Sequence, residues 1–160
     1  MEQKQEYEVS EGVGVRGFYH VQIVEGDQIV GDSGWRENQV TNLGFNQFLV
    51  SALGSISGSK YVSHVGLGTG GAPAAGDTAL TGEVGTRQAV TAATSSGSKT
   101  LRLTSTFAAG WHTSASAHNI SNIGLFNSSS SGTLFAGNTY ASSSCASNQA
   151  VNVTYDIIFA

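Results

Sequence analysis

Alternating apolar and polar residues predict β-strands along much of this chain. The clearest case is the C-terminal run, where Val151, Val153, Tyr155, Ile157 and Phe159 occupy every second position. A period of two is typical of a strand with one buried face. Because the pattern continues to the penultimate residue, we expect the C-terminus to be held within a sheet.

Similar patterns predict further strands, separated by polar turns. They cover residues 13–23, 29–40 (interrupted at 32–34), 61–67, 83–93, 101–107, 120–126 and 134–140. Residues 94–98 form the turn of a predicted hairpin, and the low-complexity segment 141–149 predicts a loop. About eight or nine short strands with frequent turns favour a two-sheet sandwich or a closed barrel. We predict an all-β fold, an antiparallel, jelly-roll-like β-sandwich.

One segment has the period of a helix instead. Phe45, Phe48, Leu49 and Ala52 fall at i, i+3, i+4 and i+7, which places them on one apolar face. The pattern predicts a short α-helix near residues 42–53, with that face in the core and Gly54 as the left-handed C′ residue just past its end.

A glycine-rich stretch, 66–80, stands between two predicted strands. Gly66, Gly68 and Gly71 match the dinucleotide fingerprint G-x-G-x-x-G, but Pro73 follows and no amphipathic helix begins there. We therefore interpret the stretch as an ordered loop, anchored by Leu80, and we expect no nucleotide cofactor.

Composition and charge narrow the classes of function. The 160 residues suffice for one domain with a core, so we predict a flexible N-terminal arm, 1–12, and a single β-sandwich domain, 13–160. With 7 Lys and Arg against 11 Asp and Glu and no basic cluster, nucleic-acid binding is not expected. The charged N-terminus lacks the apolar region of a signal peptide, and no run is long enough to span a membrane. We expect synthesis in a cytoplasm.

Candidate chemistry is sparse. The carboxylates form no local pair, and the six-residue spacing of His112 and His118 fits neither helical nor zinc-ligand spacing. We therefore expect no catalytic residues, metal or cofactor. Cys145 is interpreted as a small filler or exposed thiol, with an intersubunit disulfide as the alternative. Trp35, Trp111 and Tyr140 could stack on sugar rings, or they could cover the edge of the core.

Several short motifs together resemble a known group of proteins. They are Asn38-Gln-Val-Thr-Asn-Leu-Gly44, Val65-Gly-Leu-Gly-Thr-Gly70, Asp77-Thr-Ala-Leu80, Glu83-Val84 with Arg87, Ile123-Gly-Leu-Phe126, Gly132-Thr-Leu-Phe-Ala136 and the terminal strand. Over residues 35–160 the chain resembles the small β-sandwich structural proteins of tailed bacteriophages. That group includes capsid decoration (cement) proteins and tail or fibre components, and the resemblance brings no catalytic residues with it.

The resemblance implies a non-enzymatic virion protein. We expect a homotrimeric decoration protein on the capsid surface that binds the major capsid protein and stabilises the head shell. The alternative is a tail, neck or fibre component that binds a host glycan. A hydrolytic or lectin-like domain unrelated to phages is a third hypothesis. The candidate interaction residues are Glu2, Lys4, Glu6, Tyr7, Trp35, Trp111 and His112.

Overall fold

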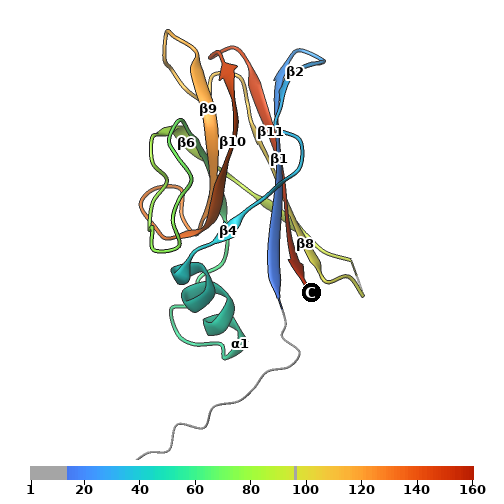
Figure 1. Ribbon diagram of the computed structural model, residues 1–160, viewed down its shortest axis with the longest axis vertical. Helices are drawn as coiled ribbons and strands as arrows, with labels where there is room; N and C mark the ends of the chain where they lie inside the picture. Colours follow the sequence, from blue (N-terminus) through green and yellow to red (C-terminus); the bar gives the residue numbers. More distant parts are fainter. Residues whose placement is uncertain (1–13, 96) are drawn as a thin grey trace, which may run out of the picture.

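The computed structural model describes residues 14–95 and 97–160, which form two antiparallel sheets packed face to face (Figure 1). This arrangement confirms the predicted all-β antiparallel sandwich and decides against a closed barrel. The six-stranded sheet contains β1 (Val15–Glu25), β2 (Gln28–Asp32), β3 (Arg36–Glu37), β7 (Thr91–Ala93), β8 (Thr100–Phe107) and β11 (Ala150–Phe159). The five-stranded sheet contains β4 (Gln39–Val40), β5 (His64–Gly68), β6 (Glu83–Ala89), β9 (His118–Phe126) and β10 (Leu134–Cys145).

The two most regular sequence patterns form the centre of the six-stranded sheet. β1 and β11 pair antiparallel, with Tyr19 opposite Tyr155 and Val21 opposite Val153. All four side chains are buried, as their alternation predicted. At the open end of this pair, the amide N–H groups of Gly14 and Ala160 each donate to the other's carbonyl, at 2.7 and 2.8 Å. The C-terminus is therefore held in the sheet, as expected.

The core lies between the two sheets. Its largest fully buried side chains come from both layers: Tyr19, Tyr155, Phe107, Phe135, Ile23, Leu67, Leu103, Ile120, Ile123 and Leu125. Phe126 and Leu134 are also fully buried, but they belong to a second, smaller cluster. Burial of this apolar area is the main stabilising contribution to the fold.

One predicted strand is divided between the sheets. Residues 83–93 were expected to form a single strand, but β6 ends at Ala89 in one sheet and β7 begins at Thr91 in the other. Between them, the Val90 amide donates to the carbonyl of Ser63 at 2.9 Å. Local alternation continues through this crossing, so the sequence pattern could not reveal it. The predicted hairpin that follows is confirmed, since β7 pairs with β8.

A second correction concerns the segment 141–149, which was expected to be a loop. β10 extends to Cys145, and Ser143, Ser144 and Cys145 pair with β9 opposite Ile120, Asn119 and His118. The register shifts between Thr139 and Ser143, so an irregularity interrupts the strand. A serine-rich segment shows little apolar alternation, so its sequence does not indicate a strand. The strand forms because β9 supplies the pairing partners.

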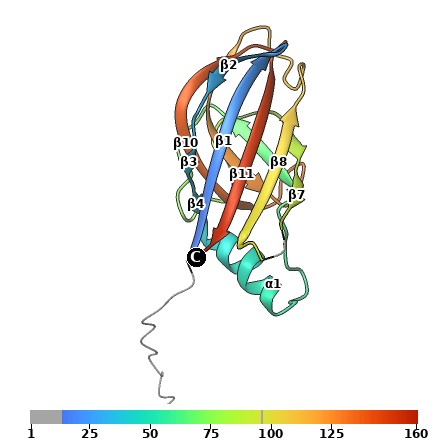
Figure 2. The same cartoon turned by 90° about the vertical axis from the view of Figure 1, so that its right-hand side faces the viewer.

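The helix lies where it was predicted, at the end of the sandwich that holds the C-terminus (Figure 2). The Thr41 hydroxyl accepts the Gly44 N–H at 2.9 Å and caps its start. The helix is π-helical over Gly44–Val50 (η1) and α-helical over Ser51–Leu53 (α1).

Two details of the helix prediction are wrong. Phe48 is 4% exposed, but Phe45 is 43% exposed and Ala52 is also exposed, so the expected face is not buried as a unit. The wider π-helical winding, visible where the Ser51 N–H donates to the Asn46 carbonyl, changes the angular spacing of the side chains. The left-handed residue at the end is Ser55, with φ of 49°, whereas Gly54 has φ of −94°.

Residues 66–68 belong to β5, and the remainder of the glycine-rich stretch 66–80 is an ordered loop without a helix, as interpreted. Leu80 is 5% exposed and packs with Phe126 and Leu134, which confirms its role as an anchor. The fully buried Asn122 side chain, on β9, donates to the carbonyls of Gly71 at 3.1 Å and Thr81 at 2.9 Å. One amide group thereby joins both sides of the loop to the neighbouring strand.

Candidate functional site

The sequence-predicted interaction residues do not form one site. Glu2, Lys4, Glu6 and Tyr7, together with the arm 1–12, lie outside the described residues. Of the others, Trp111 and His112 are found in the core and Trp35 on the surface. The candidates that the structure describes therefore do not share one surface.

Trp111 and His112 require a correction, because they are only 8% and 3% exposed. The Trp111 ring packs edge-on against Phe107 at 5.0 Å, and His112 contacts Trp111 at 4.7 Å and His118 at 4.9 Å between ring centroids. Burial lowers the pKa of His112, and the neighbouring His118 lowers it further. Trp111 thus covers the edge of the core, which was the alternative considered for it.

Cys145 and Tyr140 are also core residues, 0% and 8% exposed. Burial raises the pKa of the Cys145 thiol, which keeps it protonated and poorly nucleophilic. The interpretation of Cys145 as a filler thiol fits this position. Among residues 14–95 and 97–160, no three His, Cys, Asp or Glu side chains gather as a metal site would require. Within the same ranges, no helix has the length and apolarity needed to cross a membrane.

Trp35 is the exposed candidate, with half of its surface accessible. Its ring lies 5.4 Å from that of His20. The Asp32 carboxylate holds the corner together: it pairs with His20 Nε2 at 2.6 Å and accepts from Gln22 Nε2 at 2.9 Å and the Gly34 N–H at 2.7 Å. The hydrogen bond from Gln22, followed by that from Gly34, lowers the pKa of Asp32. An exposed aromatic ring beside hydrogen-bonding groups in fixed positions is suited to binding a ligand ring that carries polar substituents.

An apolar end of the molecule surrounds the helix. We define it by its exposed apolar side chains, which are Phe45, Val50, Leu53, Ile56, Tyr61 and Phe159. Leu53 is 91% and Tyr61 77% exposed. Tyr61 and Phe159 also line an apolar cavity of about 320 Å³, whose floor includes Phe48 and Ile157. Apolar side chains concentrated in this way are characteristic of association surfaces.

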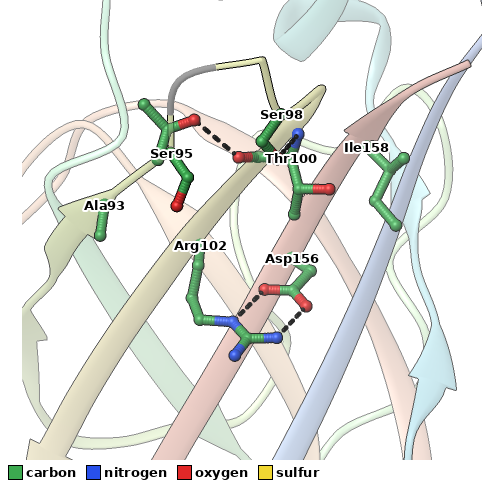
Figure 3. Close-up of a pocket in the computed structure, with 8 residues that line it drawn as sticks. Ala93, Ser95, Ser98, Thr100, Arg102, Asp156 and Ile158 are labelled. Atoms are coloured by element: carbon green, nitrogen blue, oxygen red, sulfur yellow. Dashed lines mark hydrogen bonds and ion pairs between the residues drawn. The ribbon is translucent and has the colours of Figure 1, made fainter.

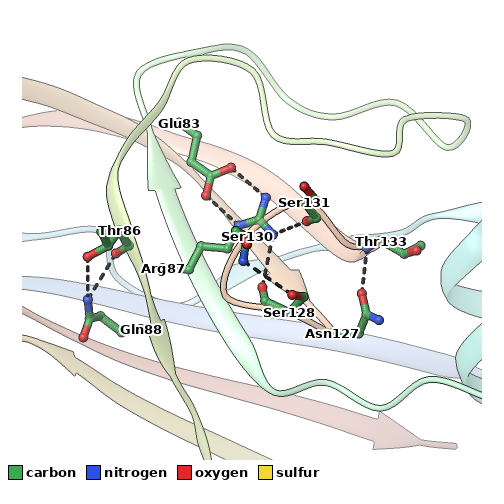
Figure 4. Close-up of polar contacts among 9 residues, drawn as sticks. All are labelled: Glu83, Thr86, Arg87, Gln88, Asn127, Ser128, Ser130, Ser131 and Thr133. Atoms are coloured by element: carbon green, nitrogen blue, oxygen red, sulfur yellow. Dashed lines mark hydrogen bonds and ion pairs between the residues drawn. The ribbon is translucent and has the colours of Figure 1, made fainter.

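Two arginine–carboxylate pairs stabilise polar parts of the surface. Arg102 on β8 makes a two-bond pair with Asp156 on β11, at 2.8 and 2.7 Å, beside a hollow of about 390 Å³ (Figure 3). Arg87 on β6 pairs with Glu83 and donates to the carbonyls of Ser128 and Ser131 in the loop between β9 and β10 (Figure 4).

The roles of Asn122, Arg87 and Asp32 were not apparent from the sequence. Each side chain connects segments that are distant along the chain: Asn122 holds the loop 66–80, and Arg87 reaches the loop after β9. No local spacing signals such contacts. The neighbouring Trp35 was the only sequence signal for the corner around Asp32.

No model of a protein family, no curated protein and no solved structure matches this chain significantly. The candidate surfaces of the chain itself, the apolar end and the corner around Trp35, therefore carry the functional argument.

Proposed function

We propose that this chain is a non-enzymatic virion structural protein, a capsid decoration protein that binds the major capsid protein on the outside of the head. The motif resemblance over residues 35–160 suggested this class, and the all-β sandwich agrees with the fold it implies. The observation that carries the proposal is the apolar end around the helix, since a structural protein acts through surfaces that associate.

The occupant we propose for the apolar end is a second copy of the chain. Burying side chains as exposed as Leu53 and Tyr61 against the same surface of another copy would remove apolar area from water, which favours association. Interfaces between permanent subunits are more apolar than ordinary surface. A closed three-fold ring would cover the apolar end of every copy at once, which agrees with the expected trimer.

The copy number of the chain in purified particles tests this function. A decoration protein is expected at a number comparable to that of the major shell protein, as measured by quantitative mass spectrometry of particles. Complete absence from particles would overturn the virion proposal.

The second candidate function is a tail, neck or fibre component that binds a host glycan. The exposed Trp35, fixed beside His20 and the Asp32 carboxylate, favours it. A small copy number per particle would support this candidate against decoration of the head.

A further inference from the structure

Many outward-facing side chains of the six-stranded sheet can form hydrogen bonds: His20 and Gln22 on β1, Asn152 and Thr154 on β11, Thr104 on β8 and Thr91 on β7. The apolar Phe18 and Ile158 lie on the same face. The face is hollowed twice, by about 390 Å³ beside Arg102 and Asp156 and by about 360 Å³ beside Thr104 and Thr154. Figure 3 shows the first of these hollows.

One row of this face crosses four strands, β1, β11, β8 and β7, in register. His20 lies opposite Thr154, Thr154 opposite Thr104, and Thr104 opposite Thr91. With neighbouring strands about 4.8 Å apart, these residues span about 14 Å. Trp35, just before β3, extends the row beyond His20 through its contact with that ring. It is thus a strip of hydroxyl groups that begins at an exposed aromatic ring.

The two arginines on the face are paired. Arg16 contacts Glu37 at 3.0 Å and Arg102 contacts Asp156 at 2.7 Å. Asp32 contacts His20 at 2.6 Å, and that histidine carries a charge only when it is protonated. These pairs leave neither arginine free to attract an anionic ligand or a polyphosphate. The threonine hydroxyls and the Asn152 and Gln22 amides can both donate and accept, which matches the chemistry of an uncharged polyol.

We propose that this face binds a neutral oligosaccharide, with one sugar ring stacked on Trp35 and the following rings bonded to Thr154, Thr104 and Thr91. The inference deepens the second candidate function, and it places the sugar site at Trp35 and not at Trp111, which is buried. It does not depend on where in a virion the chain is located, because the site lies on one protomer.

The test is binding of the full chain to a microarray of neutral and acidic oligosaccharides, followed by titration of the strongest neutral ligand. Trp35→Ala removes the stacking ring, and Thr104→Val removes one hydroxyl at nearly constant size. Thr86→Val is the matched control, since it removes the hydroxyl of an exposed threonine on β6, in the other sheet. Circular dichroism and thermal unfolding verify that each variant is folded.

We expect neutral oligosaccharides to bind, with affinity at least about tenfold weaker in Trp35→Ala, several-fold weaker in Thr104→Val and unchanged in Thr86→Val. Binding confined to acidic oligosaccharides, equal binding by Trp35→Ala, or the absence of any bound oligosaccharide would each overturn the proposal. The particle copy number is measured separately, so failure of the glycan site and failure of the virion function are distinguishable.

Discussion

The Arg87 guanidinium lies over the ring of Phe126, 3.4 Å from the ring centroid. Phe126 ends β9 in the small buried cluster with Leu80 and Leu134, whereas Arg87 comes from β6, two strands away across the five-stranded sheet. The same guanidinium pairs with Glu83 at 2.6 Å and bonds to the loop after β9. A cation on an aromatic face, with its N–H groups directed to carboxylate and carbonyl oxygens, fixes that loop against the sheet.

Replacing Arg87 by Met should therefore destabilise the protein by about 2–4 kcal/mol, because the partly buried Glu83 carboxylate and two loop carbonyls lose their donors. Urea unfolding measures the change. Arg16→Met is the matched control: Arg16 and Glu37 are both more than half exposed, so its loss should cost about 1 kcal/mol or less. Equal costs for the two variants would refute the role assigned to Arg87.

The helix offers a matched pair of phenylalanines. Phe48 packs against Phe135 at 5.2 Å between ring centroids and is 4% exposed, so Phe48→Ala should cost about 3–5 kcal/mol. Phe45, three residues earlier, is 43% exposed, and Phe45→Ala should cost about 1 kcal/mol or less. Thermal or urea unfolding of both variants tests whether Phe48 is the buried side chain and Phe45 the exposed one.

Acid should destabilise the fold through His112. Burial lowers the pKa of His112 in the folded state, so the unfolded chain takes up a proton at a pH where the folded protein does not. This contribution to stability is present above the unfolded pKa of about 6.5 and is lost as the pH falls toward the lower folded pKa. The free energy of unfolding, measured from about pH 7.5 down to about pH 5, should decline less steeply in His112→Leu. Parallel pH profiles for the two proteins would contradict this account.

The apolar end predicts self-association. Leu53 is 91% exposed in the protomer, so Leu53→Asp should leave the folded protomer intact while placing a charge in the proposed contact between copies. Sedimentation velocity should show a trimer for the unaltered chain and a monomer for Leu53→Asp. Ala117→Asp, at an exposed position outside the apolar end, is the control and should remain trimeric. If the unaltered chain is a monomer at micromolar concentration, the proposal that a second copy covers the apolar end is wrong.

The regular strands were predictable because their information is local. In β1 and β11 the side-chain period of two assigns each residue to the core or the outer face, and Tyr19, Val21, Val153 and Tyr155 are buried as their positions require. The helix near residues 42–53 and the glycine-rich loop were recognisable for the same reason, since spacing and turn residues act on neighbouring positions.

The candidate site could be predicted only in part. The sequence identified Trp35 and Trp111 as equal candidates, but contacts with distant residues separate them. Trp111 is buried against Phe107, whereas Trp35 is half exposed and packs against the ring of His20 on β1. The row from His20 to Thr91 likewise exists only because the strands pair in one register.

The sequence by itself therefore determined the kind of fold, the faces of its regular strands and the position of its helix. Tertiary structure decided the crossing between sheets at Val90, the extension of β10 to Cys145, and the exposure of Phe45 beside the buried Phe48. The physical reason is that alternation reports which side of a strand is apolar, whereas pairing partners, sheet membership and exposure depend on contacts between residues far apart in the chain.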